Sequence, residues 1–180
     1  ETIRTQAKFD AAHRQLDYDG KCRFVHGHTW HGTFDVKAER FPRDKVLGMS
    51  VDFGALKDII KFLDHKMLVS EHDEVFLNSE LFEPEGVVVI PGKNPNVEGV
   101  AHYAMSAAID TLAKLYPGEG VTYDIEVTIA ETENNVFTFS FCQALFQNPG
   151  MYVLCKRLRH SCTTFSSYLL IINIFVQMVS

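Results

Sequence analysis

The expected fold follows from one stretch of sequence, H-G-H-T-W-H-G-T-F-D-V-K-A at residues 26–38. Glycine apart, its even positions hold ring or aliphatic side chains and its odd positions hold polar ones. A period of two is typical of a half-buried β-strand, because successive side chains point to opposite faces of a sheet. The pattern therefore predicts a long strand in which His26 and His28 lie on the same face.

Similar patterns on either side of this strand predict three more. Alternation from Ile3 indicates a first strand that ends near residues 11–13, and Gly20 lies in the connection. Residues 121–129 alternate in the same way, and Asn134-Asn135 is a turn signal before a returning strand over residues 136–141.

Two helices are expected between these pairs of strands. Asp52 can cap a helix with an apolar face from Phe53 to Leu63, and Asn96 can cap another that Pro117-Gly118 end. The order β-β-α-α-β-β predicts an α+β fold: a four-stranded antiparallel sheet with both helices on one face. Open edges on such a small sheet favour assembly into a homo-oligomer.

Composition narrows the class of protein. The chain has 180 residues, is 46% hydrophobic and carries a net charge of −6. This suits one domain with a real core and disfavours a nucleic-acid-coating protein. Apolar runs stay below the 18 residues of a membrane span, and residues 1–20 lack a signal-peptide pattern. We expect a cytoplasmic protein with neither a membrane nor a nucleic acid as partner.

The composition changes near residue 141. Residues 1–141 hold all 23 acidic residues, whereas residues 142–180 carry only three charges, all basic, and three of the four cysteines. We therefore divide the chain into a domain over 1–141 and an atypical tail over 142–180. The tail ends in the apolar run YLLIINIFVQMV, residues 168–179. It is a packed extension, an oligomer contact, or a sequence not native to the domain.

The histidines are the first candidates for chemistry. Two imidazoles on one strand face form a natural half-site for zinc, which takes three protein ligands and keeps one position open when it is catalytic. His13, at the end of the preceding strand, is the expected third ligand beside His26 and His28. The alternative is a set of polar histidines packed at a strand end.

Four other residues carry reactive groups. Cys22 has basic neighbours that favour a thiolate base or nucleophile, although an inert small side chain is the alternative. Asp64-His65 can form a general acid/base pair or simply end a helix. Glu131 continues an apolar strand face, where its carboxylate would bind an amidine-like donor pair or serve as a buried structural acid. Glu98 is either a helix-dipole partner or a ligand contact.

Five motifs in order resemble one family. They are F-D-A-A-H at 9–13, C-R-F-V-H-G-H at 22–28, L-D-H at 63–65, P-N-V-E at 95–98 and E-T at 131–132. This series resembles the 6-pyruvoyltetrahydropterin synthase / 6-carboxytetrahydropterin synthase family over about residues 2–141. The resemblance implies the tunnelling fold, in which subunits join their sheets into a barrel as trimers or hexamers.

The resemblance also implies roles for the candidate residues. It implies Zn²⁺ held by His13, His26 and His28, Cys22 as the catalytic base with Asp64 and His65 as acid/base partners, and Glu131 and Glu98 as substrate-binding residues. The implied substrate is a pterin triphosphate, 7,8-dihydroneopterin triphosphate. Asn96 departs from the family, which usually has Thr there, and the tail matches nothing in its pattern.

The spacing between Cys22 and His26 favours one activity within the family. Three intervening residues resemble the 6-carboxytetrahydropterin synthases of queuosine biosynthesis, lyases that release acetaldehyde and triphosphate. The pyruvoyl enzymes of tetrahydrobiopterin synthesis usually have five. The alternatives are therefore a 6-pyruvoyltetrahydropterin synthase and a non-catalytic zinc- and pterin-binding module.

Overall fold

The computed structural model describes residues 1–42, 48–50, 52–115, 122–145 and 152–155. Within these residues the chain forms three α-helices, two short 3₁₀ turns and a seven-stranded sheet of order β4-β3-β1-β2-β5-β6-β7. The strands are β1 (Thr2–His13), β2 (His26–Lys37), β3 (Lys66–Ser70), β4 (Val87–Ile90), β5 (Thr122–Ala130), β6 (Val136–Leu145) and β7 (Tyr152–Cys155). The helices are α1 (Phe53–Lys61), α2 (Glu74–Leu77) and α3 (Val97–Leu115), and the 3₁₀ turns are η1 (Lys21–Arg23) and η2 (Pro84–Gly86).

The centre of the sheet is the antiparallel pair β1–β2. Its register runs without interruption from Thr2 opposite Lys37 to His13 opposite His26. The side chains of Phe9, Trp30 and Phe34 are buried on the face toward the helices, and the Phe9 and Trp30 rings stack with centroids 5.7 Å apart. The alternation in residues 26–38 thus produces one apolar and one polar face, as predicted.

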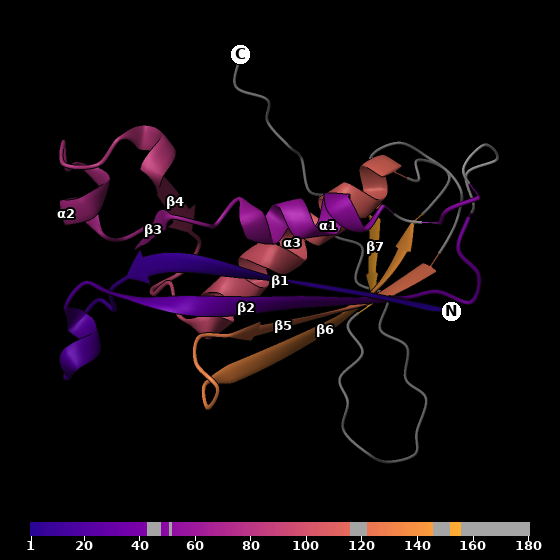
Figure 1. Cartoon of the computed structure of the whole chain (residues 1–180), viewed down its shortest axis with the longest axis horizontal. Coiled ribbons are helices and arrows are strands. Elements are labelled where there is room, and N and C mark those ends of the chain that lie inside the picture. The colour runs from indigo at the N-terminus through magenta and orange to yellow at the C-terminus, as the bar shows by residue number, and fades with distance from the viewer. Residues whose placement is uncertain (43–47, 51, 116–121, 146–151, 156–180) are drawn as a thin grey trace.

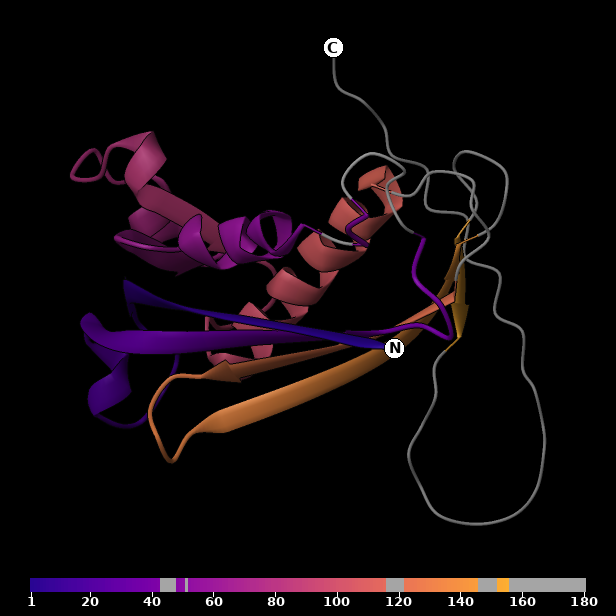
Figure 2. The ribbon, with the colours of Figure 1, turned by 45° about the vertical axis from the view of Figure 1, so that its right-hand side comes forward.

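Helices α1 and α3 cover the apolar face, as Figures 1 and 2 show from two directions. Both begin at the predicted caps: Asp52 Oδ1 accepts from Gly54 N at 2.7 Å, and Asn96 Oδ1 accepts from Gly99 N at 2.9 Å. A Cβ at Gly32 would overlap the end of the Ile60 side chain, so the glycine allows α1 to approach β2 closely.

The prediction of a four-stranded antiparallel sheet is wrong in strand number and direction. Between the helices the chain forms β3, parallel to β1, and β4, parallel to β3, so the sheet is mixed. Residues 67–70 are all buried. A strand covered on both faces reads as a continuous apolar run without period-two alternation, which is why the pattern did not reveal it.

The sheet continues past residue 141. Strand β6 runs through Leu145, and β7 pairs with it antiparallel from Cys142 opposite Cys155 to Leu145 opposite Tyr152. The division into 1–141 and 142–180 stays a prediction. The apolar run 168–179 and the helix end at Pro117-Gly118 lie outside the described residues.

Within the part of the chain that the structure describes, every helix is too short or too polar to cross a membrane.

A substitution on α1 tests how the helix packs on the sheet. Ile60 is fully buried against β2, so Ile60→Ala should lower the free energy of unfolding by about 3 kcal/mol through lost burial and a cavity. Phe62, which follows α1 and is 55% exposed, is the control: Phe62→Ala should cost less than about 1 kcal/mol. Urea denaturation measures both, and equal losses would contradict this packing.

Candidate metal centre

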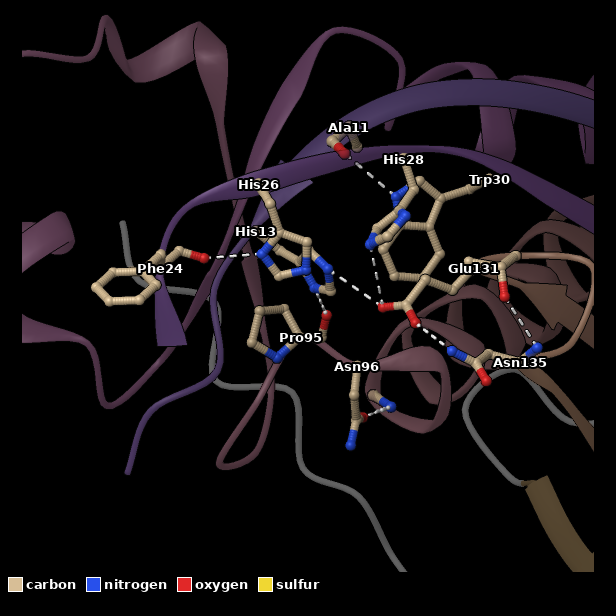
Figure 3. Close-up of polar contacts among 12 residues, drawn as sticks. Ala11, His13, Phe24, His26, His28, Trp30, Pro95, Asn96, Glu131 and Asn135 are labelled. Atoms are coloured by element: carbon tan, nitrogen blue, oxygen red, sulfur yellow. Dashed lines mark hydrogen bonds and ion pairs between the residues drawn. The ribbon is translucent and has the colours of Figure 1, made fainter. Parts of the chain in front are cut away.

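Three imidazoles meet at one end of the sheet. The β1–β2 register sets His13 directly opposite His26 and Ala11 opposite His28, so all three side chains share the helix-facing side. One ring nitrogen from each lies within 4.8 Å of the other two. The ring centroids are 4.6 Å apart for His13 and His26, 5.4 Å for His13 and His28, and 5.0 Å for His26 and His28. Figure 3 shows this histidine cluster.

Backbone carbonyls orient two of the rings. His13 Nδ1 lies 2.7 Å from the Pro95 carbonyl oxygen, and His26 Nδ1 lies 2.8 Å from that of Phe24. A carbonyl oxygen only accepts hydrogen bonds, so Nδ1 is the protonated nitrogen in both rings. With Nδ1 as the donor, each ring can turn the lone pair of Nε2 toward a metal, which is the arrangement that metal-binding histidines adopt.

Glu131 points into the histidine cluster from the end of β5 (Figure 3). Its Oε1 lies 3.2 Å from His13 Nε2 and 3.8 Å from His28 Nε2. Its Oε2 accepts from Asn135 Nδ2 at 3.2 Å, and its backbone N–H donates to the Asn135 carbonyl at 3.0 Å, so the turn after β5 holds the carboxylate in place.

The buried ring nitrogens and the Glu131 carboxylate together favour a bound cation. The Nε2 atoms of His13 and His28 are buried and make no hydrogen bond. Burial is the main cause that lowers the pKa of His13, which favours the neutral ring. A neutral His13 with its proton on Nδ1 turns a lone pair toward a carboxylate oxygen, and a bound cation would remove that repulsion.

The donor set fits zinc. Three imidazole nitrogens with room for a fourth ligand form the set that a catalytic zinc site uses. Nitrogens bound to one tetrahedral zinc lie about 3.4 Å apart, so ring nitrogens separated by as much as 4.8 Å have to approach by up to about 1.4 Å.

Cys22 lies close in the chain but outside the histidine cluster. It sits on η1, is half-buried and is not in a disulfide, and its carbonyl accepts from Gln15 N at 2.8 Å. This contact joins the segment after β1 to the segment before β2. Among the described residues, the group of metal-ligand type contains the three histidines and not Cys22.

Asp64 and His65 contact each other at the edge of β1, and their acid/base role stays a prediction. Asp64 Oδ2 lies 2.9 Å from His65 Nδ1, while Asp64 Oδ1 accepts from the Asp10 N–H at 2.7 Å. The Asp10 N–H and the His65 ring, in that order, lower the pKa of Asp64. His65 has φ of 58°, a conformation that non-glycine residues adopt rarely and that often marks functional sites.

Among the described residues, this pair makes no hydrogen bond, ion pair or ring contact with the histidine cluster. His65 lines a groove of about 690 Å³ with Asp10, Gly27 and Thr29, outward-facing positions of β1 and β2, and with His28 of the cluster. The Thr29 hydroxyl donates to Asp10 Oδ1 at 2.6 Å on that face. Within one chain, Asp64 and His65 therefore have no direct contact with the histidine cluster.

Glu98 is exposed on the first turn of α3. Its Oε2 accepts from Asn96 Nδ2 at 3.0 Å, so it contacts the residue that caps the helix. This placement suits the helix-dipole interpretation, and its role as a ligand contact stays a prediction.

An ion pair beside His13 was missed by the sequence analysis. Arg14 donates to both carboxylate oxygens of the buried Asp73 at 2.7 Å, and its guanidinium lies 4.4 Å from the centre of the Phe76 ring. Asp73 also accepts from Phe76 N at 3.3 Å, which caps α2. The 59 residues that separate the partners explain why no local pattern reveals this pair.

The fold and the histidine cluster define the class of protein: an α+β chain with a candidate three-histidine metal centre at the end of a curled sheet. Residues 2–141 match the model of the 6-pyruvoyl tetrahydropterin synthase family. The chain therefore belongs to the 6-pyruvoyl tetrahydropterin synthase family, as the five motifs suggested.

Several relatives bear the name 6-carboxy-5,6,7,8-tetrahydropterin synthase. A Pyrococcus abyssi protein, which carries it provisionally, is 38% identical over 100 residues, covering 50% of this chain and 60% of the relative. A Rickettsia felis protein is 29% identical over 118 residues, covering 62% of this chain and 80% of the relative.

A solved structure supports the fold. A catalytic-residue mutant of Plasmodium vivax 6-pyruvoyltetrahydropterin synthase superimposes with a TM-score of 0.53 at 21% identity, covering 78% of this chain and 98% of that one.

The Arg14–Asp73 pair predicts a pH-dependent stability. Asp73→Asn should lower the free energy of unfolding at pH 7 by about 2 kcal/mol, because a buried charged hydrogen-bond pair is lost. The hydrogen bonds from Arg14 lower the pKa of Asp73, so its contribution is full above the unfolded value of about 3.9 and is lost as pH falls through the lower folded value. Urea titrations from pH 7 to pH 2 should show the difference between the variants shrinking. A constant difference would contradict the ion pair.

Proposed function

We propose that this chain is a zinc-dependent lyase that converts 7,8-dihydroneopterin triphosphate, with water, into 6-carboxy-5,6,7,8-tetrahydropterin, acetaldehyde and triphosphate. The observation that carries the proposal is the histidine cluster with its two buried, unpaired Nε2 atoms facing the Glu131 carboxylate. Family membership and relatives bearing the name of this activity support it.

The proposed ligands are His13, His26 and His28. A bound Zn²⁺ would supply Lewis acidity that polarises the hydroxyl groups of the substrate side chain and acidifies the neighbouring C–H bonds. Glu131 would accept paired N–H donors from the pterin ring, since its carboxylate is held in place by Asn135 and is 12% exposed.

The remaining groups would move protons. Cys22 is a free, half-buried thiol with Lys21 and Arg23 as neighbours, so its thiolate would accept a proton from the substrate side chain. His65, which Asp64 orients through Nδ1, would return a proton from Nε2.

The position of Asp64 and His65 supports an active site shared between copies of the chain. In one chain the pair makes no direct contact with the histidine cluster, although His65 and His28 line the same groove. If the pair acts on a substrate held at the cluster, it has to come from a neighbouring subunit. A homotrimer or homohexamer in which the subunits join their sheets into a barrel would provide that arrangement.

The carboxy product is favoured over the pyruvoyl product by the short Cys22–His26 spacing and by the names of the relatives. The structural neighbours named 6-pyruvoyltetrahydropterin synthase share the fold at about 21% identity, which carries no argument about the product. The pyruvoyl reaction on the same substrate is the second candidate.

The first test measures zinc content and products together. The purified full chain should contain about one zinc per chain and should release acetaldehyde and 6-carboxytetrahydropterin from the substrate. His28→Ala should lose the metal and all turnover, whereas His31→Ala, on the opposite face of the same strand, should retain both. A pyruvoyl product would support the second candidate. Zinc and bound pterin without turnover would indicate the non-catalytic binding module.

The shared active site is tested by mixing two inactive variants. Cys22→Ala and His65→Ala should each retain zinc and lose turnover, because each removes one proton-transfer group. Subunits mixed by unfolding and refolding together should regain part of the activity, since some sites then combine an intact Cys22 with an intact His65. No recovery in mixtures shown by mass spectrometry to be hetero-oligomers would contradict sharing.

A further inference from the structure

The turn before α3 holds the carbonyl that orients His13. This turn, residues 91–96, receives several contacts from other segments: Ser70 Oγ donates to the Gly92 carbonyl at 2.9 Å, and Gly92 N donates to Glu71 Oε1 at 2.6 Å. The Pro95 carbonyl at the far end of the turn contacts His13 Nδ1 at 2.7 Å. The position of the turn therefore sets the position of a ring that has no exposed surface.

The side chain of Asn94 fastens this turn to the segment after β1. Its Oδ1 accepts from the Leu16 N–H at 2.5 Å, and its Nδ2 donates to the Leu16 carbonyl at 3.4 Å. Asn94 precedes Pro95, and Leu16 is three residues after His13. The paired amide contact thus spans the same two segments as the His13–Pro95 contact, as a second connection beside it.

The start of α3 limits movement on the other side. A Cβ at Gly99 would lie 2.7 Å from the Asn94 carbonyl oxygen, so α3 begins directly against the backbone of Asn94. The cap from Asn96 to Gly99 N fixes this first turn. The backbone of Asn94 packs against the start of α3, and its side-chain amide is hydrogen-bonded to Leu16. Residue 94 therefore has little freedom to move, and the Pro95 carbonyl that follows it stays at His13.

We propose that Asn94 is a positioning residue: its contact with the Leu16 backbone holds the Pro95 carbonyl at His13 Nδ1, and so keeps the proton on Nδ1 and the lone pair on Nε2. The effect of Asn94 on the His13 ring does not depend on the proposed function. Its effect on metal affinity rests on the proposed function. The hydrogen bonds of the Asn94 side chain go to Leu16 and not to the histidine cluster, so Asn94 acts through Pro95 and His13.

The decisive experiment observes the ring itself. Long-range ¹H–¹⁵N NMR on metal-free protein with ¹⁵N-labelled histidine distinguishes a protonated ring nitrogen from a bare one, and His13→Gln assigns the signal. Wild type should give His13 with a protonated Nδ1 and a bare Nε2. Asn94→Ala should add an Nε2–H population, because the Pro95 carbonyl is no longer held at the ring. A His13 signal unchanged from wild type in Asn94→Ala would overturn the proposal.

Two variants separate positioning from general loss of stability. Asn94→Asp keeps the oxygen that accepts from Leu16 N and loses the donor, so it should give a smaller change than Asn94→Ala and serves where the alanine variant does not fold. Asn78→Ala is the matched control: Asn78 Nδ2 donates to the Glu74 carbonyl at 2.9 Å at the end of α2, remote from His13 in the chain. Asn78→Ala should leave the His13 signal unchanged. The same shift in Asn78→Ala would contradict a specific role for Asn94.

Metal affinity gives the second readout. Titration with Co²⁺ against a chelator should show about tenfold weaker binding in Asn94→Ala, within the range measured for groups that orient metal-binding histidines. Unchanged affinity would contradict the effect on binding. A wild-type chain that binds no Co²⁺ would contradict the proposed function, while the NMR result on metal-free protein would still decide the role of Asn94.

Discussion

The structure depends most on the pairing register of β1 and β2. Because side chains alternate with period two, the register that sets His13 opposite His26 also sets Phe9 opposite Trp30 and buries both rings under the helices. A slip of one residue would expose the apolar face and turn the histidines away from one another. The free energy of core burial and the geometry of the candidate metal centre are therefore fixed by the same set of backbone hydrogen bonds.

The histidine cluster follows from how buried polar groups are satisfied. Two of its rings contact backbone carbonyls through Nδ1, and its nearest carboxylate, Glu131, directly follows β5, which pairs with β2. A buried bare nitrogen that faces a carboxylate oxygen costs free energy unless a positive charge lies between them. The fold tolerates this arrangement because the surrounding packing is extensive, and such uncompensated polar groups are typical of binding sites.

The sequence was sufficient for the elements with a clear period or a clear cap. Residues 26–38 predicted β2, Asp52 and Asn96 predicted the helix starts, and the strand positions of His13, His26 and His28 predicted that they would meet. The sequence did not predict elements that form only by pairing with distant segments of the chain. Residues 66–70 have no alternation because both faces are covered, so β3 was missed. Without β3, the side of the sheet on which His65 lies could not be inferred.

Strand β1 links the two halves of the proposed active site. The Asp10 peptide donates to Asp64 and accepts from the His65 N–H at 2.7 Å, and thereby holds His65 in its uncommon backbone conformation. Three residues further along the same strand, His13 points to the opposite face. If neighbouring copies share active sites, each β1 serves two of them, one on each face. A displacement of β1 would then alter the metal ligands of one site and the proton donor of the next. This arrangement would account for why residues proposed to act in one reaction make no direct contact within one chain.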